Sequence, residues 1–271
     1  MPDTAIAPDS AALARRREAL ALARRILLPV GAAAFVLFVW EFGTRLASIP
    51  EVLLPAPSAI LERIEAYSPL LLNHAWPPIW QSVAGFAIAT ALGILLATLL
   101  SASRIIRETL YPNVVFFQLI PKIALAPLFV VWFGLGPEAR LSFSVFVSFF
   151  PVVIATLAGL DNVERDLLRL CRALTASNWQ TFVSVRLPHA VPYIFSGMKI
   201  ASTFAIIGVI VGEFITSKAG LGYLILFASA QAETALIFAS ISVLCVFGLC
   251  FYGLVAIAEQ WTIRVFGDAP R

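Results

Sequence analysis

The sequence contains few of the residues from which metal centres and enzyme active sites are built. Among 271 residues there are three cysteines and two histidines, and only 13% of the residues are charged. The cysteines, at 171, 245 and 250, have neither ligand nor disulfide-framework spacing, and His74 lies far from His189. We therefore expect free thiols, no metal site and no cofactor.

Lysine is scarce as well, which bears on nucleotide hydrolysis. The three lysines are Lys122, Lys199 and Lys218, and none of them follows a glycine. The phosphate-cradling loop G-x-x-x-x-G-K-[ST] is therefore absent, and ATP hydrolysis by this motif is excluded. The sequence also lacks G-x-S-x-G, and its apolar segments contain no aspartate or histidine, which argues against an intramembrane protease. We expect a chain that is not an enzyme.

Apolar residues are abundant instead. They make up 60% of the chain, and the mean hydropathy is +0.91. A soluble domain is nearer half apolar and a quarter charged, so the composition predicts a protein that crosses a membrane several times. The net charge of +3 is too small to indicate a nucleic-acid partner.

Six segments are long and apolar enough to span a lipid bilayer, which needs about 20 residues each. The third is interrupted by Pro121, Lys122 and Pro127, and we expect it to be kinked. The sequence thus predicts an all-α fold with six transmembrane helices. They are expected at 26–46, 79–103, 111–134, 141–160, 193–217 and 234–258.

The positive charges predict the orientation. With the N-terminus inside, the inner segments hold 13 arginines and the outer segments hold four basic residues. Both termini, the tails 1–25 and 261–271, and the loop 161–192 are then cytoplasmic. The first span, 26–46, follows arginines as a signal peptide would, but no small-residue cleavage site follows it, so we expect it to be retained. It leads to an outer loop, ending at 78, with a short surface helix.

The cytoplasmic loop contains an amphipathic pattern from Val163 to Ala176. Three leucines share one stripe, and three arginines follow another. Such a helix either presses its apolar stripe into a groove on a partner or lies on the membrane surface with its arginines at lipid phosphates. Pro188 and Pro192 are expected to end the loop helix and to fix the entry into the next span. The stripes consist of Leu167, Leu170 and Leu174, and of Arg165, Arg169 and Arg172.

The same loop resembles that of importer-type ABC transporter permeases. There, Glu-Ala-Ala, a Gly three residues on, nine further residues and Ile-x-Leu-Pro form a docking helix and its exit. Aligned on Leu187-Pro188, the Gly falls on Thr175, and Glu-Ala-Ala falls on Arg169, Leu170 and Cys171. The resemblance implies that the loop contacts an ATPase subunit. The implied coupling residues are Arg169, Leu170, Cys171, Thr175, Ala176, Ser177, Val185, Leu187 and Pro188.

The chain departs from that pattern at two positions. Arg169 stands where the family has a carboxylate, which argues against a specific salt bridge from this position to the ATPase. Thr175 replaces the glycine, so we expect the backbone there to adopt a conformation that is open to non-glycine residues.

Further segments are similar to permeases of the nitrate, sulfonate and taurine group, which includes relatives for thiamine-pyrimidine precursors and riboflavin. They cover residues 79–260, the expected permease core. The matching segments are Gln118–Gly136 (QLIPKIALAPLFVVWFGLG), Phe149-Phe150-Pro151 with Thr156 and Gly159, and Tyr193–Leu224 with Gly197, Gly212-Glu213 and Gly220-Leu221-Gly222-Tyr223.

The resemblance implies a type I ABC importer permease fold in a bacterial-type inner membrane. The chain would form the path for a small solute, as a homodimer with two ABC ATPase subunits and an extracytoplasmic substrate-binding protein. A self-sufficient carrier or channel is the alternative, although inverted repeats, which would favour it, are not evident.

Ionisable residues inside the spans are candidate functional sites because their burial in lipid is costly. Lys122, with Gln118 nearby, could line a path for an anionic substrate; the alternatives are snorkelling or pairing with a carboxylate. Glu213 is expected to pair with Lys218 or to hold the turn at 220–223, with a gate-supporting role as a further option. Glu41 and Arg45 have the spacing of a local ion pair.

Small residues recur at about every fourth position in two spans, which lets helix backbones approach closely in lipid. The stripes serve either a sliding subunit interface or packing within one chain. They are Gly85, Ala89, Gly93, Ala97 and Ser101, and Gly197, Ala201, Ala205, Gly208 and Gly212.

Overall fold

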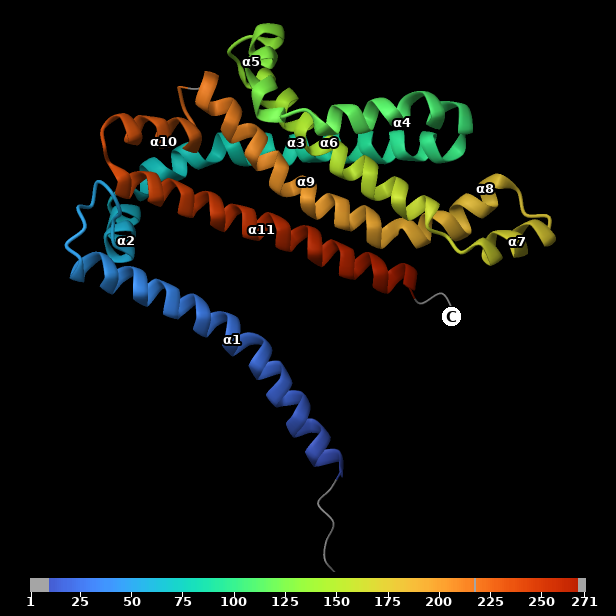
Figure 1. Ribbon diagram of the computed structural model, residues 1–271, viewed down its shortest axis with the longest axis horizontal. Coiled ribbons are helices and arrows are strands. Elements are labelled where there is room, and N and C mark those ends of the chain that lie inside the picture. Colours follow the sequence, from blue (N-terminus) through green and yellow to red (C-terminus); the bar gives the residue numbers. More distant parts are fainter. Residues whose placement is uncertain (1–9, 217, 268–271) are drawn as a thin grey trace, which may run out of the picture.

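The computed structural model describes residues 10–216 and 218–267, and in these ranges the chain forms helices and no strand (Figure 1). The long helices run side by side along one axis, apart from α1, which diverges from them. The elements are α1 (Ser10–Leu46), α2 (Pro57–Ala66), α3 (Ser68–Ala102), α4 (Arg104–Leu119), α5 (Lys122–Phe133), α6 (Pro137–Asp161), α7 (Arg165–Ala173), α8 (Asn178–Thr181), the π-helical turn η1 (Phe182–Arg186), α9 (Leu187–Thr216), α10 (Leu221–Ala230) and α11 (Thr234–Gly267).

Within the described residues, five helical stretches are long and apolar enough to cross a membrane, and a bent pair supplies a sixth if it is one span. The all-α, multi-span prediction is therefore confirmed. The segment between the first two spans contains α2, which is the short helix expected there. However, α3 already begins at Ser68 and continues through Pro77 and Pro78, so the second span starts well before residue 79. The five stretches are Leu27–Leu46, Ser68–Ala102, Pro137–Asp161, Asn178–Thr216 and Thr234–Val265.

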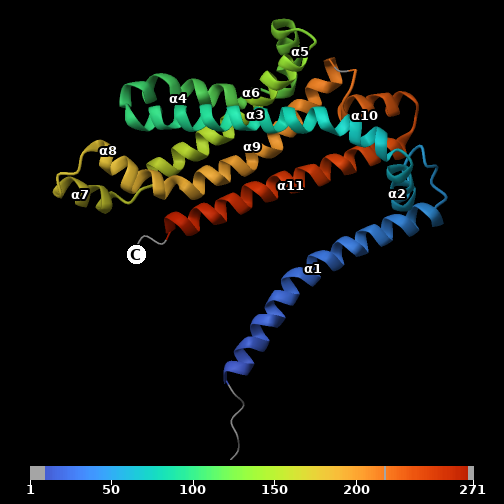
Figure 2. The same cartoon turned by 180° about the vertical axis from the view of Figure 1, so that it is seen from behind.

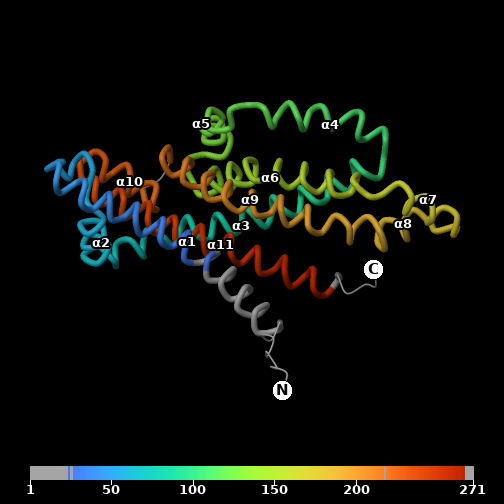
Figure 3. Tube along the Cα trace, turned by 60° about the horizontal axis from the view of Figure 1, so that its bottom comes forward, coloured from blue at the N-terminus to red at the C-terminus, as the bar shows by residue number. Residues whose placement is uncertain are grey.

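The third span is broken rather than merely kinked. α4 and α5 are bent by 103° relative to each other. Ile120, between them, is extended with ψ 135°, as expected for a residue that precedes a proline, here Pro121. α4 lies on the side of the bundle opposite α1, while α5 turns across α6 and α9 (Figures 1 and 3). The interruption thus changes the direction of the chain inside the apolar region.

The core forms where α6 packs between α3 and α9. A side-chain carbon at Gly93 of α3 would lie 2.9 Å from the Val152 side chain, and one at Gly208 of α9 would lie 2.7 Å from the Ser144 backbone. Ala89 and Ala201 of the two stripes are fully buried. Both stripes therefore serve packing within one chain, because α6 occupies the faces that a second subunit would need.

α1 touches the rest of the molecule mainly at its C-terminal end, and its remainder diverges from the bundle (Figures 1 and 2). The predicted Glu41–Arg45 ion pair is present at 2.6 Å. Glu41 also accepts hydrogen bonds from the Ser58 backbone and hydroxyl, at 3.0 and 2.9 Å. Because Ser58 lies in the first turn of α2, the carboxylate ties α1 to the N-terminus of α2.

Candidate functional site

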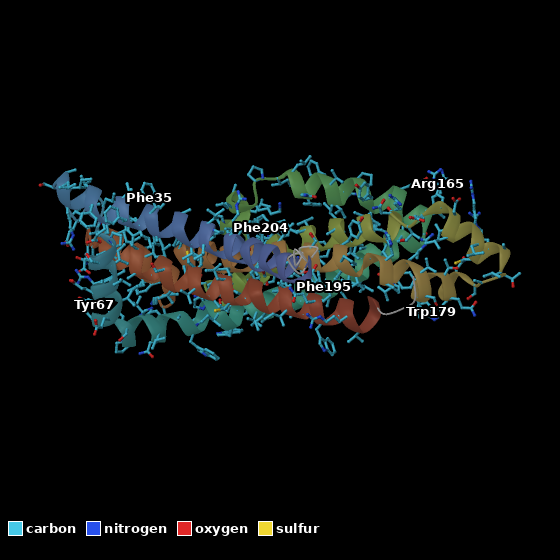
Figure 4. The ribbon with its side chains drawn as sticks, turned by 90° about the horizontal axis from the view of Figure 1, so that it is seen from below. Phe35, Tyr67, Arg165, Trp179, Phe195 and Phe204 are labelled. Atoms are coloured by element: carbon cyan, nitrogen blue, oxygen red, sulfur yellow. The ribbon has the colours of Figure 1, made fainter. Side chains whose placement is uncertain are left out.

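α7 confirms the amphipathic helix predicted in the loop, although it is shorter, from Arg165 to Ala173. None of its residues is buried. The leucine stripe is exposed, by 43% at Leu167, 55% at Leu170 and 70% at Leu174. Figure 4 shows Arg165 and Trp179 at the same end of the elongated molecule. The stripe is therefore left largely uncovered by residues 10–216 and 218–267.

α7 ends in a Schellman motif. The Ala176 amide donates to the Cys171 carbonyl at 2.9 Å, and the Thr175 amide donates to the Arg172 carbonyl at 3.1 Å. Thr175 has φ +56°, so it adopts the left-handed conformation that glycine favours. The expectation of an ordinary backbone at Thr175 is wrong. The hydrogen bonds of the motif require a left-handed residue at this position, and Thr175 adopts that conformation at a cost in backbone strain.

The segment after this turn is one helical run, and the prediction that prolines end a loop helix is wrong. Ser177 caps α8 in a capping box with Gln180. α8, η1 and α9 then follow without a break, from Asn178 to Thr216. Pro188 has no amide proton to donate, and just before it the Leu187 amide bonds to Phe182, five residues back. The π turn therefore ends two residues before Pro188, and the helical run continues through this proline.

The C-terminal end of the loop is joined to the spans. Leu187 packs against a buried cluster in which Leu160 belongs to α6 and Ala190 to α9. The Arg186 guanidinium donates to the Ser101 hydroxyl of α3 at 3.3 Å. Val185 is partly buried and Pro188 is exposed. A displacement of the loop would therefore reach three spans through direct contacts.

Arg169 stands at the position of the family's carboxylate, and its side chain forms an ion pair within α7. Its guanidinium pairs with Asp166 at 3.0 Å, and both side chains are largely exposed. Such an exposed pair contributes at most about 1 kcal/mol, so Arg169 remains available to a partner. Cys171, Ala176 and Ser177 lie at the end of α7 and in the following turn, the first two partly buried and the last exposed.

Lys122 is the first residue of α5, directly after the break. Its ammonium donates to the Gln118 backbone carbonyl at 2.9 Å and lies 5.5 Å from the centre of the Phe150 ring. Within the described ranges, no carboxylate forms an ion pair with it. The Gln118 side chain is exposed and meets Lys122 through its main chain only. Pairing with a carboxylate is thus not how Lys122 is accommodated.

Glu213 is 1% exposed and holds a turn at the end of α9. Its carboxylate accepts the Gly222 amide at 2.7 Å, as one of the two sequence-based alternatives predicted. His74 of α3 accepts the Gly220 amide at 3.1 Å from the other side. Gly220 has φ +115°, which a residue with a side chain rarely adopts. No local sequence pattern points to His74, because it lies 146 positions from its partner.

The second lysine inside the spans has a partner that the sequence analysis did not identify. Lys199 of α9 pairs with Glu259 of α11 at 2.8 Å, and both side chains are largely buried. Arg107 of α4 pairs with Asp161, at the end of α6, at 2.8 Å. Both ion pairs join neighbouring spans, whereas Lys122 forms no ion pair within the described ranges.

The fold and the loop together define a helical membrane protein with a protruding helical loop, and comparisons with known proteins identify its family. Residues 89–264 match the family described as the inner membrane component of binding-protein-dependent transport systems. The chain belongs to this family. It is therefore a multi-pass permease subunit of an ABC importer, and the resemblance seen in the sequence is confirmed.

Individual relatives agree with this assignment. The chain is 36% identical to a probable ABC transporter permease protein of Haemophilus influenzae, over 84% of this chain and 93% of the relative. It is 32% identical to the formylaminopyrimidine transport permease ThiX of Halalkalibacterium halodurans, over 83% and 90%. It is 28% identical to the taurine permease TauC of Escherichia coli, over 89% and 90%.

Solved structures show the same fold. The MetNI methionine ABC transporter, in an inward-facing conformation, aligns with a TM-score of 0.62 and 19% identity, covering 74% of this chain and 98% of that chain. An amino acid ABC transporter aligns with a TM-score of 0.63 and 17% identity, covering 74% and 97%. The type I importer fold predicted from the sequence is confirmed.

Proposed function

We propose that two copies of this chain form the translocation path of the importer, with two ATPase subunits on the cytoplasmic side. Each ATPase binds the loop 161–192 of one copy, and a substrate-binding protein docks outside. Both termini are cytoplasmic, and the chain itself does not hydrolyse ATP. The relatives named for pyrimidine and taurine transport support a small solute as the cargo.

The exposed apolar stripe of α7 carries this proposal. α7 and α8 extend beyond the ends of α6 and α9 along the common axis, so they project away from the apolar spans (Figures 1 and 2). This position favours a groove on a protein partner over the membrane surface. A helix that inserts exposed leucines into such a groove gains the burial that this chain does not provide.

Contacts at the base of the loop support its role in coupling. Closure of the ATPases on ATP would move α7, and the continuous run from Asn178 to Thr216 would carry that movement into α9. The Leu187 cluster and the Arg186–Ser101 hydrogen bond would pass it to α6 and α3. Access to the path would then switch because both ATP and substrate bias the same two-state element.

We assign Lys122 and Gln118 to the wall of the path, and Glu213 to support of the outer turn. Lys122 is half-buried, bears a charge and lacks a carboxylate partner within residues 10–216 and 218–267. Glu213 is enclosed by its own turn, so its effect on a gate would be exerted through Gly220 and Gly222.

The experiment is a mild-detergent purification of the tagged full-length chain from its native membrane, with quantification of co-purifying ATPase. We expect near-equal stoichiometry for the unmodified chain and loss of the ATPase in Leu170→Asp. Arg172→Asp places the same carboxylate on the opposite face of α7 and should retain the ATPase. Retention of the ATPase by Leu170→Asp, with both variants monodisperse, would contradict the docking assignment.

A further inference from the structure

A hollow of about 270 Å³ lies where α5 crosses α6 and α9, beside the break in the third span. Its wall consists of Lys122 and Ile123 from α5, Phe143 and Val147 from α6, and Phe204 and Ile207 from α9. Figure 4 shows Phe204 about midway along the molecule. A solute that follows the path proposed above would pass this point.

Lys122 is the only charged residue of this wall. An ammonium group has three N–H donors, and one of them is used on the Gln118 carbonyl. The Phe150 ring meets the charge through its face, which is a weaker partner than an oxygen acceptor. A charge among apolar spans is costly unless it is paired, so the remaining donors favour a ligand that brings an oxygen acceptor.

The rest of the wall is aromatic and aliphatic. Phe204 offers an accessible ring, and Ile123 and Ile207 offer exposed aliphatic side chains that form no hydrogen bond. Phe143 and Val147 are buried at the floor of the hollow. A small, fully hydrated ion would have to lose its water against these surfaces with a single ammonium as compensation. A planar ring instead places one face against Phe204 and its edge toward Lys122.

The size of the hollow fits one ring. An apolar cavity of about 150 Å³ accommodates benzene. The larger volume observed here therefore admits a single substituted ring with its edge oxygens.

We propose that this hollow is a solute subsite for a planar heteroaromatic ring whose edge carries an anionic or carbonyl oxygen. Lys122 binds the edge oxygen, the partly exposed Phe204 contacts one face of the ring, and the exposed side chains of Ile123 and Ile207 cover the rest of it. The inference rests on the assignment of this region to the path, and it specifies the substrate class that the chain itself favours, apart from any selection by the binding protein.

The test measures binding to the full-length chain in lipid nanodiscs without a binding protein, by saturation-transfer-difference NMR. The probes are orotate, a planar heteroaromatic carboxylate; cyclohexanecarboxylate, which has the same charge and no flat ring; and taurine. We expect orotate to bind at least about tenfold more tightly than the other two; because all three probes carry an anionic acceptor for Lys122, this difference corresponds to the contact of the flat ring with Phe204. Equal binding of taurine, or no binding of orotate, would overturn the proposal.

Two variants locate the binding. Lys122→Met keeps the length of the side chain and should weaken orotate binding about tenfold. Ile207→Trp fills the hollow from a residue that is 41% exposed and should abolish binding, whereas Ile215→Trp, on the same helix at a 42% exposed site, should leave it unchanged. Unchanged orotate binding in Ile207→Trp would place the ligand elsewhere and refute the site. The binding measurement needs no ATPase. Absence of orotate binding with normal co-purification of the ATPase would refute the subsite alone, and loss of co-purification with normal orotate binding would refute the docking assignment alone.

Discussion

The α3–α6–α9 core and the α7 loop differ in what they need from outside the chain. In the core, Val152 and Ala201 are completely buried, and small residues let the helix backbones touch. In α7 no residue is buried, and Leu174 is 70% exposed. The core is complete within one chain, whereas no described residue covers the leucine stripe of α7, and the covering surface that we propose belongs to the ATPase.

The two regions also depend on different forces. Lipid is as apolar as leucine, so spans associate through close packing and hydrogen bonds, and glycine is useful where backbones meet. Outside the membrane, exposed apolar surface is unfavourable, and a contiguous stripe of it marks an interaction site. Substitutions should therefore affect folding in the core and assembly in the loop.

The largest effect is expected where helix backbones meet. Gly208→Leu would force a side chain into a position 2.7 Å from the Ser144 backbone, and backbone cannot move aside as a flexible side chain can. We expect destabilisation of about 3 kcal/mol or more, seen as loss of monodisperse protein in detergent and a lower unfolding temperature.

Gly253→Leu is the matched control for this substitution. It makes the same change in α11, where nothing lies within 4 Å of the added carbon. If both variants behaved alike, the α9 backbone would not be in close contact with α6, and the contrast between core and loop would be lost.

The second effect concerns the turn after α9. Glu213→Leu removes the acceptor of the Gly222 amide and leaves that donor buried, which should cost about 1–3 kcal/mol. Glu213→Gln keeps a carbonyl oxygen for the same amide and should retain most of the stability. Thermal unfolding in detergent compares the two variants, and equal loss in both would show that the charge matters rather than the hydrogen bond.

Much of this arrangement follows from the sequence because it depends on local periodicity. The leucines of α7 share a face, and a helix of fixed pitch brings them together. The small residues at every fourth position of α3 and α9 fall on one face for the same reason. The choice between subunit interface and internal packing could not be made, however, because it depends on where α6 lies.

Features that depend on distant or strained geometry were not predictable in this way. The contact between His74 and Gly220 joins α3 to the turn before α10, and only the folded chain brings them together. Threonine rarely adopts positive φ, so the sequence predicted an ordinary conformation for Thr175. The prolines of the third span predicted an interruption, but the 103° bend also depends on the packing of α5 across α6 and α9.

The third prediction concerns the backbone strain at Thr175, in the turn that ends α7. Thr175→Gly removes the cost of a side chain at φ +56° and should stabilise the end of α7 by about 1 kcal/mol. Hydrogen exchange should then be slower at the amides of the Schellman motif, those of Thr175 and Ala176. Thr175→Ala retains the side-chain carbon and should give little of this gain; faster exchange in Thr175→Gly would contradict the assignment of strain.

The smallest effect on folding is expected at the stripe itself. Leu174→Ser removes an apolar side chain that is 70% exposed and contributes little to packing within the chain, so the stability of the isolated permease should change by no more than about 0.5 kcal/mol. The same variant should bind the ATPase more weakly, because the stripe loses one of its three leucines. Thermal unfolding of the isolated chain and co-purification of the ATPase measure the two quantities separately. A large loss of stability in the isolated chain would mean that α7 packs on its own spans, and α7 would then belong to the core side of the comparison.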